Sequence, residues 1–195
     1  KWLRSDEGAL FLIAALFVIA HFATNSAYGF HRDELATLDD ARHMEWGFVA
    51  YPPLTPAVGR VEMVLFGVST FAVRVVPTLA MALAIFVSSL IARDLGGLRK
   101  AQVLTALAVS MVPIVSIETN VLQYVSFDYL FGVVLTYFIL RLLKSEDPRW
   151  WVPIGAVIGL GMMNKYTMAF FVVGLAVGVF LTPARRLLLN RWLFI

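Results

Sequence analysis

The chain has 195 residues, of which 60% are hydrophobic and 15% are charged, and its formal net charge at pH 7 is +3. Soluble domains are about 45–50% apolar and about 25% charged, so this composition excludes an ordinary soluble domain and favours a membrane protein. The absence of cysteine from the sequence excludes a disulfide framework and a thiolate metal site. The basic residues stand in short clusters between apolar runs and form no basic face, which argues against a role in binding nucleic acid.

The apolar runs predict an all-α fold, a polytopic transmembrane helical bundle. About four full spans, each near the ~20 residues that cross ~30 Å of hydrocarbon, are expected at residues 9–27, 75–92, 101–117 and 128–143. The last apolar region is interrupted by Lys165. Its two halves, residues 150–164 and 166–182, would reach only about 22 Å and about 26 Å as helices. We therefore expect a pair of shorter helices after the full spans.

We expect residues 1–195 to form one transmembrane domain. The chain begins with Lys1 rather than Met, and residues 191–195 read as the start of another apolar run. Both observations favour an N-terminal fragment of a longer membrane protein.

Residues 28–74 form a long, semi-polar first loop between two apolar runs. Apolar residues recur at near-helical spacing over residues 34–46, and the prolines at 52 and 53 end this pattern, so a short interfacial helix is predicted there. A second amphipathic helix is predicted at residues 54–66. On the first of these helices, we expect the charged side chains after the helix start to form a solvated face: Asp39, Asp40, Arg42 and Glu45.

The distribution of basic residues predicts the orientation in the membrane. The N-terminus and residues 93–100, 141–149 and 185–191 carry most of them and would lie in the cytoplasm. Residues 28–74 would then face outward, which predicts a site open to the periplasm or exterior. As a separate expectation, not given by the charge distribution, the membrane is a bacterial inner (plasma) membrane. Residues 150–182 must form two short helices in this scheme, because one long helix would place Arg185 and Arg186 outside.

Lys165 is the first candidate for chemistry. An ammonium group at membrane depth costs about 2.5 kcal/mol or more, and such a group usually faces a cavity and a partner. The helix predicted to start near Tyr166 would direct its N-terminal amides toward the same place, which suits a phosphate. The alternative is a lysine whose ammonium group reaches the outer headgroups.

A charged cluster, Arg32, Asp33 and Glu34, follows the first span. One carboxylate facing a cavity could act as a general base, the other could bind sugar hydroxyls or a cation, and the arginine could contact a phosphate. The alternative is that all three are charges at a helix start on a solvated loop. Asp128, at the expected start of the fourth span, is either a site residue or a helix cap.

No metal site has a diagnostic spacing. His31 and His43 lie near acidic residues, but the pattern matches no known ligand set. No cofactor is therefore predicted from the sequence, and a divalent cation stays open as an addition to the site.

Several segments resemble, in the same order, the N-terminal part of a family of membrane glycosyltransferases related to protein O-mannosyltransferases and to the lipid A aminoarabinose transferase. These segments are residues 28–35 (YGFHRDEL), 51–54 (YPPL), 92–97 (ARDLGG), 124–130 (YVSFDYL) and 159–167 (GLGMMNKYT). The resemblance covers nearly the whole chain. In relatives the segment corresponding to Tyr51-Pro-Pro lines the same cavity and is often preceded by histidine or a charged residue, whereas Ala50 precedes Tyr51 here.

The resemblance implies the GT-C fold and an inverting glycosyltransferase. Such enzymes transfer a sugar from a polyprenyl-phosphate donor to an acceptor hydroxyl of a glycan, lipid or protein at the outer face of the membrane. It implies that Asp33 is the catalytic carboxylate and that Lys165 helps to hold the donor phosphate. The substrate-binding candidates are Arg32, Glu34, Tyr51, Asp128, Lys165 and Tyr166.

A different class of protein is the alternative. A membrane transporter, or a lipid-binding subunit without chemistry, can also contain broken helices and a buried lysine. That interpretation predicts a site near the middle of the bilayer and internal repeats, and the sequence shows no convincing repeat. A purely structural subunit would leave Asp33, Glu34 and Lys165 without a role.

Overall fold

The computed structural model describes residues 6–188 and 192, and within these residues the protein is all-helical. The helices in chain order are α1 (Asp6–Thr24), α2 (Arg32–Arg42), α3 (Leu54–Phe66), α4 (Val75–Asp94), α5 (Arg99–Ser110), α6 (Pro113–Glu118), α7 (Tyr124–Ser145), α8 (Trp151–Asn164) and α9 (Met168–Phe180). Short 3-10 turns lie at Ala72–Arg74, Pro148–Trp150 and Pro183–Leu188. The predicted all-α fold is confirmed.

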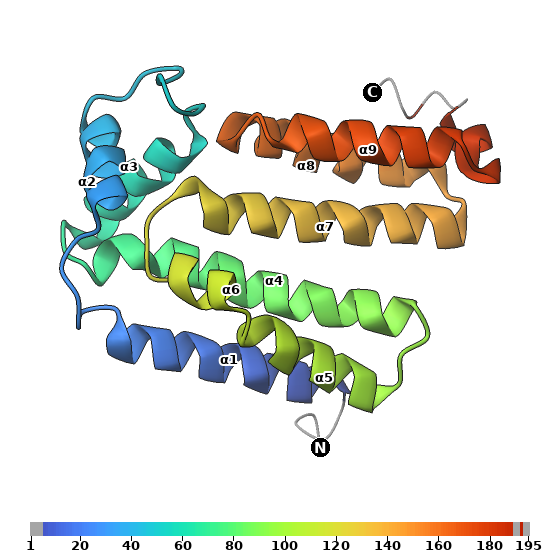
Figure 1. Ribbon diagram of the computed structural model, residues 1–195, viewed down its shortest axis with the longest axis horizontal. Helices are drawn as coiled ribbons and strands as arrows, with labels where there is room; N and C mark the ends of the chain where they lie inside the picture. The colour runs from blue at the N-terminus through green and yellow to red at the C-terminus, as the bar shows by residue number, and fades with distance from the viewer. Residues whose placement is uncertain (1–5, 189–191, 193–195) are drawn as a thin grey trace.

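The long helices lie side by side, and α2 and α3 cover one end of the bundle (Figure 1). Helix α4 is central and packs against α1, α5 and α7. One buried apolar cluster joins α1 to α4, α5 and α6, and another joins α7 to α8 and α9. A third, built around Leu38, Val73 and Leu122, lies beneath α2 and fixes this helix on the end of the bundle.

Three described helical segments are long and apolar enough to cross a membrane: Glu7–Thr24, Ala72–Asp94 and Tyr124–Ser145. The protein is therefore an integral membrane protein, but the expected full span at residues 101–117 is wrong. Helix α5 ends at Ser110, and Val112 adopts an extended backbone before Pro113 begins α6. A proline disfavours helical backbone at the residue before it and lacks the amide that a continuous helix needs.

The two short helices expected near Lys165 are confirmed as α8 and α9, with 14 and 13 residues. They run antiparallel, so the segment after α9 returns to the start of α8 (Figure 1). The indole Nε1 of Trp151 donates to the carbonyl of Leu187 at 3.0 Å, and Arg186 forms an ion pair with Glu146. Arg186 thus lies at the same end of the bundle as the start of α8, as the orientation argument required.

Helix α2 begins and ends earlier than predicted, at Arg32 and Arg42, because residues just before it cap its start. The amide of Asp33 donates to Nδ1 of His31 at 3.2 Å, and the amide of His31 donates to Oε2 of Glu34 at 3.0 Å. This reciprocal arrangement is a capping box, which satisfies two amides of the first turn. Helix α3 has the predicted bounds.

Candidate active site

A cavity of about 600 Å³ lies at the end of the bundle that α2 covers. Its walls come from one face of α2, the loop after α2, the start of α7 and the turn between α8 and α9. The lining residues are Asp33, Ala36, Thr37, Asp40, Gly47, Phe48, Val49, Ala50, Tyr51, Gln123, Tyr124 and Lys165. Segments far apart in the sequence therefore meet at one hollow.

The spacing of the α2 residues explains which of them face the cavity. Residues 33, 36, 37 and 40 follow the i, i+3, i+4, i+7 pattern of a single helical face. Leu38 and Ala41 lie on the other side, where they are buried against the bundle. The amphipathic pattern thus fixes α2 so that two carboxylates, Asp33 and Asp40, stand on the cavity wall.

Asp33 is the carboxylate nearest the start of α2, and its side chain is 36% exposed. Nε2 of Gln123 donates to its Oδ2 at 3.1 Å, which links α2 to the start of α7. Nε of Arg32 donates to the other oxygen, Oδ1, at 3.3 Å, but the arginine side chain is 93% exposed and does not line the cavity. The hydrogen bond from Gln123 therefore orients the Asp33 carboxylate, which lines the cavity.

Lys165 lies in the turn after α8 and points its ammonium group toward the same cavity. Its Nζ donates to the carbonyl of Ala50 at 3.2 Å and stands 3.8 Å from the ring centroid of Tyr124. A carbonyl oxygen and an aromatic face are both attractive partners for a cation. Neither neutralises the charge, so the ammonium group is placed to take an anion.

The preceding residue, Asn164, is fully buried and fixes the turn. Its Oδ1 accepts from Thr55 of α3 at 2.7 Å, and its Nδ2 donates to the carbonyl of Tyr124 at 3.0 Å. Asn164 is not among the site residues predicted from the sequence. The available signal was a polar amide at the end of an uncharged helix, directly before the lysine.

Tyr51 and Asp40 form a pair on the cavity wall. The phenol of Tyr51 donates to Oδ2 of Asp40 at 2.7 Å, and its ring lies 6.2 Å from that of Tyr124. Burial raises the pKa of Tyr51 to about 12, so its hydroxyl stays protonated and donates at neutral pH. The expectation that Asp40 belongs to a solvated face is wrong, because this residue lines the cavity.

Glu34 lies away from the cavity, in a buried ion pair with Arg74. Nε and Nη2 of Arg74 donate to the two carboxylate oxygens at 2.8 and 2.7 Å, and the amide of Leu122 adds a bond of 3.1 Å. Both side chains are at most 2% exposed. Glu34 thus joins α2 to the turn before α4 and to the start of α7, and the geometry offers it no contact with a ligand in the cavity.

Asp128 and Tyr166 also lie outside the cavity lining. Asp128 accepts from Oγ1 of Thr167 at 3.0 Å beside a separate small hollow of about 170 Å³. It does not cap α7, because that helix starts earlier, at Tyr124. Tyr166 is 66% exposed. A substrate contact by either residue stays a prediction.

The first amides of α9 are not directed at the cavity as expected. They donate instead to the carbonyls of Lys165, Tyr166 and Thr167, in a tight first turn. The cavity lining therefore offers an anion the ammonium group of Lys165 and not the amides of α9.

The histidines near the acidic residues have local partners. His31 caps α2, and His43 lies 3.6 Å from Asp39 at an exposed position. Within residues 6–188 and 192, no three side chains of the metal-binding types come together as a group.

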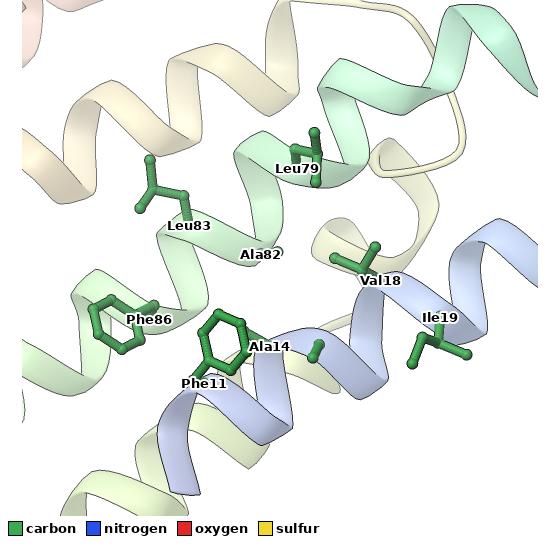
Figure 2. Close-up of a pocket in the computed structure, with 9 residues that line it drawn as sticks. Phe11, Ala14, Val18, Ile19, Leu79, Ala82, Leu83 and Phe86 are labelled. Carbon is green, nitrogen blue, oxygen red and sulfur yellow. The ribbon is translucent and has the colours of Figure 1, made fainter. Parts of the chain in front are cut away.

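A further hollow, of about 450 Å³, lies between α1 and α4 (Figure 2). Its lining is apolar throughout, with Phe11, Val18, Leu83 and Phe86 among the residues drawn. Both helices are candidate membrane spans, so a face of this kind suits contact with hydrocarbon and offers no group for chemistry.

A protein-family model described as dolichyl-phosphate-mannose-protein mannosyltransferase matches residues 50–195. The match spans more than half of the chain. The protein belongs to this family. It is accordingly a membrane glycosyltransferase of the mannosyltransferase type, with a polyprenyl-phosphate sugar as donor. Neither a curated protein nor a solved structure matches the chain.

The matched region begins after Asp33 and Asp40, and it contains five of the cavity-lining residues: Ala50, Tyr51, Gln123, Tyr124 and Lys165. The family assignment therefore covers the lysine side of the cavity.

Proposed function

We propose that this protein is an inverting glycosyltransferase that moves a sugar from a polyprenyl-phosphate donor to the hydroxyl of a glycan, lipid or protein acceptor. We further propose that it acts at the outer face of a bacterial plasma membrane. The observation that carries the proposal is that Asp33 and Lys165 line one cavity at the same end of the bundle. A base and a cation that share a cavity can act on the two ends of one displacement reaction.

Asp33 is the general base. Its carboxylate takes the proton from the acceptor hydroxyl, and the acceptor oxygen then attacks the anomeric carbon from the face opposite the phosphate. The bond between the anomeric carbon and the phosphate oxygen breaks, and polyprenyl phosphate leaves. A single displacement inverts the anomeric centre without a covalent intermediate, as in inverting hydrolases. Gln123 donates to Asp33 and holds the carboxylate toward the cavity.

Lys165 stabilises the departing phosphate. Charge builds on the phosphate oxygens as the bond breaks, and a cation fixed beforehand favours that state without reorganising. Nζ of Lys165 already donates a hydrogen bond to the carbonyl oxygen of Ala50, so there is room for an oxygen atom beside this ammonium group. A phosphate oxygen is a stronger partner for a cation than a carbonyl, so the donor would replace this contact. Arg32, exposed next to Asp33, is a further cation that the donor could reach.

The position of the cavity favours an enzyme over a transporter. A transporter is expected to bind its substrate near the bilayer midplane, between repeats. Here the polar groups gather at one end of the bundle, under α2 and the loop that follows it. This position gives access to a lipid-linked phosphate in the headgroup region and to an acceptor outside the membrane.

Analysis of lipid carriers and sugars in membranes with and without the intact protein tests the proposal. We expect membranes that lack the protein to accumulate a polyprenyl-phosphate sugar and to lose that sugar from an acceptor. The same donor level and the same acceptor sugars in both membranes would overturn it.

A further inference from the structure

We propose that Asp40 is the residue of the cavity that recognises the donor sugar. Its free carboxylate oxygen accepts hydrogen bonds from sugar hydroxyls, and Tyr51 holds the carboxylate in place. The inference rests on the proposed function and adds a sugar-binding subsite to it.

Helix α2 places Asp40 far enough from the proposed base, Asp33, for a sugar to lie between them. Asp33 and Asp40 are two turns apart on one face of α2, a rise of about 10 Å. Both line the cavity, and neither points to the membrane-spanning core. With the acceptor oxygen at Asp33, the body of the sugar can extend along α2 toward Asp40.

One carboxylate oxygen of Asp40 accepts a hydrogen bond from the residues that the structure describes, and the other does not. Oδ2 accepts from the Tyr51 phenol at 2.7 Å, while no donor in the described part of the chain reaches Oδ1. Asp40 also has no ion-pair partner among these residues. A half-buried carboxylate is an acceptor for up to four hydrogen bonds, so its unused capacity suits a ligand rich in hydroxyl groups.

Tyr51 fixes the direction of this acceptor. Its hydroxyl lies within 3.5 Å of Thr37 Oγ1 as well as donating to Asp40, and its ring packs beside Tyr124. The rotamer of Tyr51 is therefore held at both ends of the side chain. Tyr51 acts on the sugar through Asp40, as a positioning residue.

The chain supplies a matched control for Asp40. Asp39 precedes it on α2, but its side chain is 72% exposed and pairs with His43 outside the cavity. Asp39→Asn and Asp40→Asn make the same change of charge on adjacent residues of one helix. Only the second changes the cavity wall.

The test compares the binding of two lipids, dolichyl phosphate and dolichyl-phosphate mannose, to the full-length protein in lipid nanodiscs. We expect Asp40→Asn to weaken binding of the mannose-bearing lipid by roughly 10- to 100-fold, the range for hydrogen bonds to a charged group. Binding of the bare lipid phosphate should stay unchanged. Asp39→Asn should change neither affinity. Tyr51→Phe should weaken binding of the mannose-bearing lipid only, and by less than Asp40→Asn does.

If the Asp40→Asn and Asp39→Asn proteins bind each lipid with the same affinity, the sugar-binding role of Asp40 is overturned. An equal loss for both lipids would overturn it too, because it would show a general disturbance of the cavity. Either result leaves the proposed function standing when the parent protein binds the mannose-bearing lipid. A parent protein that binds neither lipid would overturn the proposed function together with this inference.

Discussion

Asp33 and Lys165 line the same cavity, the first from the start of α2 and the second from the turn between α8 and α9. The start of α7 connects them, because Gln123 donates to Asp33 and the ring of Tyr124 lies under the Lys165 ammonium group. The connection fixes a base and a cation relative to one another through rigid helices. Such fixed geometry is what a displacement at a sugar phosphate requires.

Lys165→Ala should weaken donor binding. The substitution removes the cation that faces the phosphate, and the loss should be roughly 10- to 100-fold in affinity for dolichyl phosphate. Lys165→Arg keeps the charge and should recover part of the affinity. Lys100→Ala, at an exposed position near the start of α5, serves as a control for loss of one positive charge. Unchanged affinity in Lys165→Ala would remove this residue from the site.

Glu34→Ala should destabilise the fold. The substitution leaves Arg74 buried without its carboxylate, which typically costs about 3–5 kcal/mol. Arg32→Ala, at a fully solvated position, should cost less than about 1 kcal/mol. Unfolding in detergent by urea, followed by circular dichroism, measures both. A Glu34→Ala protein with parental stability and lost donor binding would instead support the substrate-binding role that the sequence suggested.

Stability should fall as pH rises between about 6 and 8 because of Glu62. This side chain of α3 is fully buried, and burial raises its pKa from 4.5 to about 8. In this range the folded protein keeps a proton that the unfolded chain has lost, so each pH unit lowers the free energy of unfolding, by at most about 1.4 kcal/mol. The effect is complete above the folded pKa.

Glu62→Gln removes this titration. We expect the melting temperature of the parent protein to fall over this pH range and that of Glu62→Gln to change less. If the melting temperatures of the parent and Glu62→Gln proteins change in parallel with pH, the pH dependence does not come from Glu62.

The orientation can be tested by labelling single cysteines, since the sequence contains none. Tyr166→Cys and Arg186→Cys place a thiol at an exposed position at each end of the α8–α9 pair. A membrane-impermeant maleimide added from outside should label residue 166 and leave residue 186 unlabelled until the membrane is opened. Labelling of residue 186 from outside would reverse the proposed orientation.

Much of the fold could be predicted because its signals are local. The bounds of α3 follow from prolines and apolar spacing, and the two short helices follow from the length of the apolar runs and the position of the basic residues. The break before Pro113 was also a local signal, but the apolar composition on both sides hid it. A hydrophobic run shows that a segment is buried in the membrane without showing that it is one helix.

The site was harder to predict because it depends on long-range contacts. Asp33 and Glu34 are adjacent, yet one lines the cavity and the other is buried against Arg74, 40 residues away. Successive helical residues point about 100° apart, so the start and rotation of α2 decide their roles. Asp40 could be assigned to the cavity only once that rotation was known.

Asp33→Asn tests the central claim most directly. The amide cannot accept the proton of the acceptor hydroxyl, but it has nearly the same shape and keeps an oxygen for Gln123. We expect membranes with this variant to bind dolichyl-phosphate mannose as the parent does and to transfer sugar about 10²- to 10⁴-fold more slowly. Transfer at the parental rate, with donor binding intact, would contradict the assignment of Asp33 as the base.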